Sequence, residues 1–492
     1  MKNIVIVGGG TAGWLAAFYI LKTKPEYKIT VIESSTIGII GAGEGGTHIL
    51  GSILNNTEID YGIDIKEFIA EADATFKQGV RHENWTGTNS HYFNPLDLNF
   101  SDDPNINDRL AHLIANEQPI HPVSNLGMFI DQDRCLIKKD ESGLAPVDGF
   151  SYHFDGNKVG QFFKSRVLSM GGIVVDAVVQ NVVHNNTGGI SSVILSNNTA
   201  IQGDFFIDCT GFARVLMNHV GAKWISYKDN LLMNSAMPFL LEYEPPVWPK
   251  PVTLSRALSS GWMWQIPTIE RFGCGYVFCD KFLSFEDAQA EIEKLLGHPI
   301  KPIKQIRFDS GRLDKPWSHN CLSLGLASAF VEPLEATSIH ATTIQIKKFV
   351  EYIDRSDSKT YNEEICAMYD EIKDFIVLHY LSGKTGTPFW DYISKNDIAT
   401  DLVKKVINIA KTRLLTKDDV PNKENSIGYQ AWNQILGGLG FISKEVAAKH
   451  IAGRENTVKE EFLKWQLKQI EQMSDCKTNV DAVLHGYFTN EF

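Results

Sequence analysis

A glycine-rich turn near the start of the chain has the spacing of a dinucleotide site. Residues 8–13 read Gly-Gly-Gly-Thr-Ala-Gly and fit G-x-G-x-x-G, directly after the apolar stretch 2–7. In this pattern Gly8 permits the tight turn, Gly10 lets backbone approach a pyrophosphate, and Gly13 lets the following helix pack close to the strand. The N–H groups of that helix, which begins at Thr11 and Ala12, then face the phosphates.

Two further segments extend this prediction. Glu33 ends the predicted second strand, where a carboxylate hydrogen-bonds a ribose diol. Strand, helix and acid together favour dinucleotide binding over a glycine turn that serves packing alone. Residues 207–211, Ile-Asp-Cys-Thr-Gly, are a predicted strand that ends in Asp-x-Thr-Gly. This segment resembles the second FAD-contacting segment of flavoprotein hydroxylases, with Gly211 allowing close backbone approach, and it favours FAD over NAD; a plain β-turn is the alternative.

A third feature is the string Trp262-Met263-Trp264-Gln265-Ile266-Pro267. In a strand, positions two apart share a face, so Trp262, Trp264 and Ile266 form one rigid apolar wall before Pro267. A sheet face packed into an ordinary core gives the same spacing. The string alone therefore indicates a buried strand, and its chemical meaning depends on its neighbours.

Two ionisable residues stand out against their surroundings. Lys77 follows Asp73 by four residues, a spacing typical of a solvent-exposed salt bridge on a helix. Glu335 lies in an apolar run two residues after Pro333, where desolvation would raise its pKa. The alternative for Glu335 is a carboxylate that faces a helix N-terminus, and the neighbouring Glu332 is a decoy for this prediction.

The elements that must position these residues follow from periodicity. The chain is predicted to begin with a strand–helix–strand unit and to end in helices, with strand-rich and loop-rich segments between them. The predicted elements are a βαβ unit over 2–33; a helix over 61–80 with Ile65, Phe68, Ile69, Ala72 and Phe76 on one stripe; a loop-rich insertion over 84–147; a helix over 157–172; strands over 173–183, 190–196 and 205–209; a strand-rich stretch over 230–280; helices from Ser338; a charged linker over 417–426; and a short helical tail.

Composition limits the class of protein. A chain of 492 residues with 43% hydrophobic and 22% charged residues is typical of a large globular protein, and two lobes are expected. The net charge of −12 argues against nucleic-acid binding. Seven scattered cysteines without CxxC fit neither a disulfide framework nor a zinc site, so no metal is expected and a reducing cytoplasm is favoured. The chain enters a strand at once and has no apolar run of membrane-spanning length, so neither signal peptide nor membrane contact is expected.

With these motifs in place, the chain resembles the flavin-dependent halogenases of the tryptophan halogenase family from Ile4 to about Trp390. The most specific match is Gly261–Pro267, the family's W-x-W-x-I-P. Residues 325–335, Gly-Leu-Ala-Ser-Ala-Phe-Val-Glu-Pro-Leu-Glu, are similarly close. Gly41-Ala42-Gly43-Glu44 looks like the family's flavin-side loop, and residues 74–77 look like the segment that bears its essential lysine.

The resemblance implies an α/β fold: a Rossmann-like FAD-binding lobe of the flavoprotein-monooxygenase type, inserted β-rich segments and a mainly helical C-terminal substrate lobe. The implied boundaries are 1–83, 150–225 and 300–345 for the FAD lobe, 84–149 and 226–299 for the inserted substrate and tunnel region, and 346–492 for the helical lobe. Family members often form homodimers, so a homodimer is an open alternative to a monomer.

The resemblance also implies a chemistry. In the family, FADH2 from a separate flavin reductase reacts with O2 to give a C4a-hydroperoxide, and a halide (chloride, bromide or iodide) attacks it to form hypohalous acid. That acid moves through an internal passage, walled in part by the W-x-W strand, to the lysine beside a small aromatic substrate. Lys77 is then the residue that delivers the halogen, and Glu335 orients the electrophile and accepts the ring proton. The remaining implied positions are Thr337 and Ser338 for the halide, and Gly43, Glu44, Val178, Leu326 and Ile339 beside the flavin.

The match departs from the family in places that bear on substrate. Ala336 stands where many relatives have serine. The Tyr-Tyr and glutamate that grip free tryptophan are missing from Tyr429–Gln434. The His-x-Phe that sandwiches the indole is replaced by Asn94-Pro95-Leu96, unless a shifted register uses His91-Tyr92-Phe93. Free tryptophan is therefore expected to be a poor substrate, and a substituted indole, a phenol or a carrier-bound ring is favoured.

Two other functions remain open at this point. A flavin-dependent aromatic hydroxylase shares the dinucleotide pattern and the Asp-x-Thr-Gly segment, but has no use for Lys77. A non-catalytic flavin-binding protein needs only the cofactor site.

Overall fold

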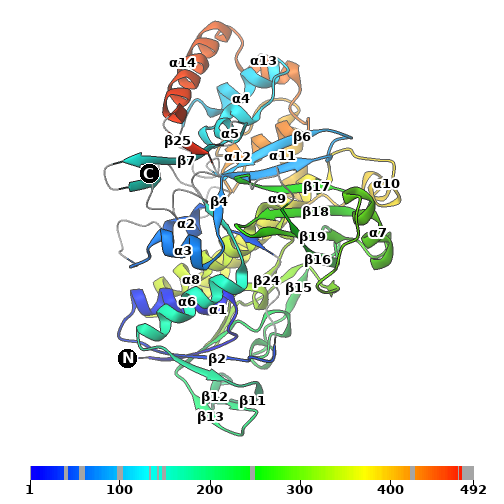
Figure 1. Ribbon diagram of the computed structural model, residues 1–492. Helices are drawn as coiled ribbons and strands as arrows, with labels where there is room; N and C mark the ends of the chain where they lie inside the picture. The colour runs from blue at the N-terminus through cyan, green and yellow to red at the C-terminus, as the bar shows by residue number, and fades with distance from the viewer. Residues whose placement is uncertain are drawn as a thin grey trace.

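The computed structural model describes residues 2–37, 43–54, 61–96, 103–131, 134–140, 143–146, 151–243, 250–421, 427–474 and 476–478. Figure 1 shows a sheet flanked by helices near the N-terminus, a second sheet beside it, and helices on the far side of that second sheet. This mixed α/β arrangement confirms the predicted fold class.

The first sheet has six strands in the order β10-β2-β1-β14-β23-β22. The strand β1 lies between β2 and β14 and pairs with both in parallel. Residues Ile4 to Val7 of β1 are buried, as expected for a parallel strand covered on both faces. The predicted βαβ unit is thus confirmed. The bounds are β10 Ile173–Asp176, β2 Lys28–Glu33, β1 Asn3–Val7, β14 Phe205–Asp208, β23 Cys321–Ser323 and β22 Trp317–Ser318.

Helices α1 (Thr11–Thr23), α6 (Gly156–Ser169) and α8 (Thr337–Tyr352) pack together beside this sheet (Figure 1). Every residue of α1 from Gly13 to Leu21 is buried. A helix that is apolar all round must be covered on all sides, and here α6 and α8 cover α1 together with the sheet. The predicted helix over 157–172 corresponds to α6, and that expected from Ser338 corresponds to α8.

The second sheet has seven strands in the order β20-β16-β19-β18-β17-β5-β6. Strand β5 pairs in parallel with β17, so a segment near residue 80 joins the strand-rich stretch predicted over 230–280. On β18, Trp262 and Trp264 belong to one hydrophobic cluster and Met263 to another, which confirms that the two tryptophans share a face. The bounds are β20 Ile306–Arg307, β16 Ser235–Glu242, β19 Arg271–Phe278, β18 Gly261–Pro267, β17 Val252–Ala257, β5 Gly79–Glu83 and β6 His91–Pro95.

A small sheet corrects the predicted helix over 61–80. Only α3 (Ile65–Glu71) is helical, because Asp73 adopts a left-handed conformation with φ 54° and ends the helical path. The chain then forms strand β4 (Thr75–Lys77), which pairs with β9 (Ser151–Phe154), and β9 also pairs with β3 (Glu44–Gly45). The apolar stripe continued to Phe76 in the sequence, but tertiary strand pairing decides the conformation there.

The stretch 84–147 is more regular than the loop-rich prediction. It contains β6, α4 (Ile106–Ala115), a 3-10 turn η2 (His121–Val123), α5 (Asn125–Asp131), β7 (Arg134–Asp140) and β8 (Gly143–Pro146). The aromatic and polar composition of this stretch did not reveal these elements. Their apolar faces pack against the C-terminal helices, and a contact of this kind cannot be read from local composition. Residues 97–102, 132–133, 141–142 and 147 of this stretch lie outside the described residues.

Helices dominate the C-terminal part, as predicted. They are α9 (Ser358–Tyr380), α10 (Pro388–Lys395), α11 (Asp401–Ala410), α12 (Tyr429–Gly438), α13 (Lys444–His450) and α14 (Glu455–Ser474), before strand β25 (Cys476–Thr478). The expected short helical tail includes the 20-residue α14. Of the predicted charged linker over 417–426, residues 422–426 lie outside the described residues.

The remaining elements complete the scaffold. They are α2 His48–Leu54, β11 Val179–His184, β12 Ile190–Leu195, β13 Ala200–Gln202, η3 Gly211–Ala213, η4 Met217–His219, β15 Trp224–Ser226, α7 Phe285–Leu296, β21 Gly311–Leu313, η5 Gly325–Ala327, β24 Ala329–Phe330 and η6 Pro333–Glu335. No disulfide joins the seven cysteines, all of which lie in the described residues. Among the described helices, none is both long and apolar enough to cross a membrane. The division into lobes stays a prediction.

Candidate active site

The predicted dinucleotide turn has the geometry that its three glycines require. Gly8 has φ +115°, and a β-carbon there would lie 2.2 Å from the Cys209 carbonyl oxygen. A β-carbon at Gly13 would lie 2.0 Å from the Gly8 carbonyl oxygen. At Gly10, by contrast, a β-carbon would meet nothing within 4 Å. Gly8 and Gly13 thus serve the turn and the close packing, while the backbone at Gly10 borders open space, as a pyrophosphate requires.

Two other predicted flavin contacts, Gly211 and Leu326, lie near the start of α1. The Thr11 hydroxyl donates a 3.0 Å hydrogen bond to the Gly156 carbonyl. A β-carbon at Gly325 would lie 3.0 Å from Ala12 Cβ, and one at Gly211 would lie 4.0 Å from Leu326 Cβ. Ala12, Gly211 and Leu326 are far apart in sequence but therefore lie near one another beside the N-terminus of α1.

The Asp-x-Thr-Gly segment is more than a plain β-turn. The buried Asp208 carboxylate accepts hydrogen bonds from the Thr210 N–H and hydroxyl and from the N–H groups of Leu216 and Met217. This anchors the loop that carries Gly211, which has φ +63°. Asp208 holds the loop in place, and Gly211 supplies the conformation that exposes its backbone.

Two predicted cofactor residues have protein partners. Glu33, at the end of β2, forms an ion pair with Lys164 of α6. The Val178 carbonyl accepts a 2.8 Å hydrogen bond from the Ser196 N–H. Their contacts with a ribose or an adenine stay predictions.

The flavin-side loop connects this region to Lys77. Gly43 has φ +86°, and a β-carbon there would lie 3.0 Å from Gly273 Cα and 3.5 Å from Ile266 Cβ. Two residues later, a β-carbon at Gly45 would lie 2.9 Å from Lys77 Nζ. The backbone of one short segment therefore touches both the predicted apolar wall and the amine. Gly41 and Ala42 lie outside the described residues.

Two further groups belong to this loop. Burial raises the pKa of Glu44 to about 7, and the nearby Asp155 carboxylate raises it as well. Thr47 Oγ1 lies 2.8 Å from Nδ1 of His340 on α8. These contacts fix the loop between β9 and α8.

Lys77 is a buried amine without a hydrogen-bond partner among the described residues. Burial lowers its pKa from 10.5 to about 7, although the negative charge of Glu335 opposes that shift. The alternative of a solvent salt bridge with Asp73 is wrong. Asp73 Oδ2 lies 3.9 Å from Lys158 Nζ, and its other oxygen accepts a hydrogen bond from the Glu270 N–H.

Glu335 is held by three donors from distant elements. His82 Nε2 on β5 and His379 Nε2 on α9 lie 2.8 Å and 2.9 Å from its Oε1. Asn94 Nδ2 on β6 donates to Oε2 at 2.8 Å. Burial alone would raise the pKa of Glu335, but the hydrogen bonds from the two imidazoles and the positive charge of this histidine pair outweigh burial and hold that pKa well below its usual range. The carboxylate thus has side-chain partners on β5, β6 and α9, beyond the predicted alternative of a helix N-terminus.

Glu332, three residues earlier, has the opposite electrostatic environment. Trp262 Nε1 and the Tyr380 hydroxyl donate hydrogen bonds to its Oε2. Both donors are neutral, and burial raises the pKa of Glu332 to about 7. Glu332 therefore fixes the tryptophan wall, whereas Glu335 is the carboxylate whose field reaches Lys77.

The predicted halide residues begin α8. Ala336, which precedes the helix, has φ 55° and provides no side-chain cap for the first N–H groups. The buried Thr337 hydroxyl has no hydrogen-bond partner among the described residues. The carbonyls of Ser338 and Ile339 accept hydrogen bonds from the Thr342 and Thr343 hydroxyls. The alanine thus leaves this helix end without a competing hydroxyl cap, a suitable setting for an anion.

Sequence reasoning missed His82 and His379. His379 interrupts an apolar helical run, Phe375-Ile-Val-Leu before it and Tyr380 after it, and this is the signal that could have identified it. His82, His379 and Glu335 each offer one potential metal-ligand atom, and these three atoms lie within 4.8 Å of one another. The cysteine pattern in the sequence therefore did not reveal every cluster of metal-ligating residue types.

The structure also decides the register left open in β6. Tyr92 stacks on His82 with ring centroids 4.6 Å apart, and Asn94 donates to Glu335. His91 is exposed and pairs across the sheet with Glu83. Because alternate residues share a strand face, Asn94 stands at the site and the shifted register through His91 is wrong.

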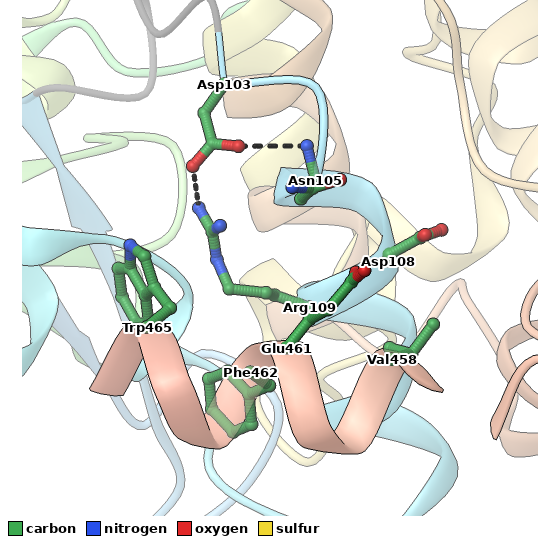
Figure 2. Close-up of a pocket in the computed structure, with 8 residues that line it drawn as sticks. All are labelled: Asp103, Asn105, Asp108, Arg109, Val458, Glu461, Phe462 and Trp465. Atoms are coloured by element: carbon green, nitrogen blue, oxygen red, sulfur yellow. Dashed lines mark hydrogen bonds and ion pairs between the residues drawn. The ribbon is translucent and has the colours of Figure 1, made fainter. Parts of the chain in front are cut away.

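A surface pocket elsewhere contains none of the predicted site residues. It lies between α4 and α14 (Figure 2), where the Arg109 guanidinium pairs with Asp103 at 2.7 Å and lies 4.3 Å from the Trp465 ring centroid. Arg109, the cation of this pocket, is already paired with Asp103 and stacked on Trp465. The candidate active site is therefore the buried cluster around Lys77 and Glu335.

The sequence profile of the tryptophan halogenase family matches residues 3–452. The chain belongs to the tryptophan halogenase family. It is accordingly an enzyme, a flavin-dependent halogenase of the oxidoreductase class. The predicted family is thus confirmed by a match that extends beyond Trp390.

Several curated and solved relatives cover nearly the whole halogenase chain. It is 30% identical over 477 residues to the tryptophan 6-halogenase SttH of Streptomyces toxytricini, covering 89% of this chain and 90% of that protein. It is 29% identical to the tryptophan 7-halogenase RebH of Lentzea aerocolonigenes, covering 82% and 81%. The solved structure of SttH aligns with a TM-score of 0.90 at 26% identity over 99% of both chains. The solved structure of a tryptophan halogenase from Shewanella frigidimarina, 24% identical, has the same fold, with a TM-score of 0.90 over 99% of this chain and 98% of that one.

Proposed function

We propose that this halogenase uses FADH2, O2 and a halide to halogenate an electron-rich aromatic compound by way of Lys77. The observation that carries the proposal is the position of Lys77. Its amine is buried, lacks a hydrogen-bond partner among the described residues, lies beside the backbone of Gly45 and is within the field of Glu335. A hydroxylase, which transfers oxygen directly from flavin to substrate, has no need of such an amine.

The cofactor site fits FAD. The open space at Gly10, the convergence of Ala12, Gly211 and Leu326, and the uncapped start of α1 are what a dinucleotide pyrophosphate needs. When bound and reduced, FAD supplies the hypohalous acid from O2 and halide. The N–H groups at Thr337 and Ser338 are proposed to hold the halide.

The protein's own residues then deliver the halogen. With a pKa near 7, Lys77 has a substantial neutral fraction at physiological pH and can bind the electrophile by hydrogen bond or as a haloamine. Trp262, Trp264, Ile266 and Pro267 are proposed to wall the passage that leads to it. Glu335 orients the electrophile and accepts the proton that the ring loses.

The substrate is proposed to be an indole or phenol type of ring and not free tryptophan, although several relatives are named tryptophan halogenases. Helix α12, where the family's amino-acid grip is expected, contains no charged residue. Its amides are engaged elsewhere: Asn433 bonds with Leu415 and Asn107, and Gln434 donates to the Phe93 carbonyl. A zwitterion therefore lacks paired charges on this helix. Saturable turnover of free tryptophan with a low KM would contradict this part.

The proposed partners follow from the reaction. A separate flavin reductase supplies FADH2 by diffusion, and a reducing cytoplasm is the proposed location. A homodimer remains an alternative to the monomer. FAD, O2 and halide are the only proposed small cofactors, with no metal and no nucleic acid.

The test is product analysis. The enzyme is incubated with a flavin reductase, FAD, O2 and a panel of indoles and phenols, with chloride, bromide and iodide in separate reactions, and the products are identified by mass spectrometry. A halogenated ring that Lys77→Ala no longer forms supports the proposal. Hydroxylated product without halide dependence, or FAD binding without any product, would contradict it.

A further inference from the structure

The carboxylate of Glu335 has its hydrogen-bonding capacity almost filled. A carboxylate oxygen accepts about two hydrogen bonds. Oε1 has two imidazole neighbours, His82 Nε2 at 2.8 Å and His379 Nε2 at 2.9 Å. Oε2 has one, Asn94 Nδ2 at 2.8 Å. One acceptor position therefore remains, and it is on Oε2.

The protons of this cluster can be counted. His379 Nδ1 lies 2.9 Å from the Phe375 carbonyl, which can only accept, so Nδ1 carries a hydrogen. A hydrogen bond from His379 Nε2 to an ionised Glu335 needs a second hydrogen, which makes the ring an imidazolium. His82 Nδ1 is buried without a hydrogen-bond partner among the described residues, so this ring is satisfied as the neutral tautomer with its hydrogen on Nε2. Burial also lowers the pKa of His82.

We propose that His82 and His379 are positioning residues that fill Oε1 of Glu335, keep this carboxylate ionised and leave the free acceptor position of Oε2 as the reacting site. His379 contributes the charge and His82 a neutral hydrogen bond. The cluster of one carboxylate and one imidazolium has no net charge, which suits a buried site. This inference rests on the proposed role of Glu335 in halogenation.

Among the described residues, four titratable groups face Glu335. They are His82 on β5, Tyr92 on β6, His379 on α9 and Lys77 on β4. Burial raises the pKa of Tyr92 well above 10.0, so its hydroxyl stays neutral. Loss of the His82 hydrogen bond removes a donor that favours the carboxylate form, so the pKa of Glu335 rises. Below the pKa of Lys77, which is about 7, the acid limb of the kcat/KM profile then falls more steeply, because Glu335 is a second group that must lose its proton.

The first test compares two substitutions of His82 in the FAD-loaded enzyme with its reductase. His82→Leu is expected to lower kcat by about tenfold to a hundredfold and to make the acid limb steeper, with the arene KM within about twofold of wild type. His82→Gln, whose amide can still donate to Oε1, is expected to recover most of kcat and the wild-type profile. His112→Leu, a substitution of a buried histidine on α4 outside this cluster, controls for general effects. A wild-type rate and profile in His82→Leu would overturn the proposal.

The second test reads protonation and needs no turnover. Nitrogen NMR of histidine-labelled protein at about pH 8 gives signals from all 14 histidines, among which two are assigned by substitution: an imidazolium from His379 and a neutral ring with hydrogen on Nε2 from His82. The first signal disappears in His379→Gln and the second in His82→Leu. A neutral His379 would overturn the proposal even if the enzyme halogenates, whereas the expected spectrum in a protein that does not halogenate would contradict only the proposed function.

A third measurement excludes a metal at the same atoms. A cation would take the lone pairs of both Nε2 atoms, which the proposal assigns to N–H donors. The protein is dialysed against Zn2+ and its metal content is measured. Stoichiometric zinc that is retained by wild type and lost in His82→Leu would overturn the proposal, and absence of retained zinc in both is the expected result.

Discussion

The cofactor end of this halogenase and its interior site are built in opposite ways. The cofactor end is formed mainly by backbone. Gly8, Gly10 and Gly13 lie within one turn, and the open space beside Gly10 exists because this residue has no side chain. The interior site is formed by side chains from four different elements: Lys77, His82, Glu335 and His379. The glycine turn is encoded by a few consecutive residues, whereas the interior site depends on which distant side chains folding brings together. The two should therefore fail separately when mutated.

Loss of the amine should show this separation most clearly. Lys77→Met is expected to lower halogenation by about a thousandfold, because His153, the other side chain beside Gly45, has its ring nitrogens engaged by Thr75 and Thr253 and offers no amine to hold the electrophile. The affinity for FAD should not change. Product formation and flavin binding are measured on the same preparation, with Lys158→Met as a control for loss of a surface lysine. A parallel loss of FAD binding would show that the two regions are not independent.

The two neighbouring glutamates sharpen the comparison within the interior site. Glu335→Gln is expected to lower kcat by about a hundredfold, since the amide can neither accept the ring proton nor balance the imidazolium. Glu332→Gln, which keeps acceptors for Trp262 and Tyr380, should stay within about tenfold of wild type. Steady-state kinetics on both variants decide the point, and equal losses would mean that Glu332 shares the catalytic role.

A substitution at the cofactor end should have the converse effect. Gly10→Val places a side chain where a β-carbon meets nothing within 4 Å, so the apo fold should tolerate it. The added methyl groups occupy the space for the pyrophosphate, and the Kd for FAD is expected to rise about tenfold. Calorimetric titration with FAD measures this. Gly160→Ala on α6, whose β-carbon would be 3.9 Å from Trp14 Cδ1, is the control and should bind FAD normally.

The smallest effect concerns stability and pH. The pKa of Glu332 is raised from 4.5 to about 7 in the folded state, so the folded protein binds the proton more tightly than the unfolded chain. The contribution of Glu332 to the free energy of unfolding is full below about pH 4.5 and is lost as pH rises through about 7. Over this window the free energy of unfolding falls by about 1 kcal/mol per pH unit. Denaturant unfolding of wild type and Glu332→Gln across this window measures the slope. A slope that Glu332→Gln leaves unchanged would assign the titration to another group.

The failed predictions show where local pattern stops being decisive. The apolar stripe from Ile65 to Phe76 predicts one helix, but Asp73 turns left-handed and β4 pairs with β9. That pairing places Lys77 in a buried strand. The alternative in which Asp73 holds Lys77 at the surface fails, because the partners of Asp73 are Lys158 and the Glu270 N–H.

The sequence by itself determined the βαβ unit with its glycine turn, the shared face of Trp262 and Trp264, and the family. These depend on local steric rules: φ at Gly8, close packing at Gly13 and alternation along one strand. Only the tertiary structure decided that Lys77 has a lowered pKa and that His82 and His379 hold Glu335, because His82 and Glu335 are 253 residues apart. Burial and charge act through space, and no local pattern records which distant side chains the fold brings together.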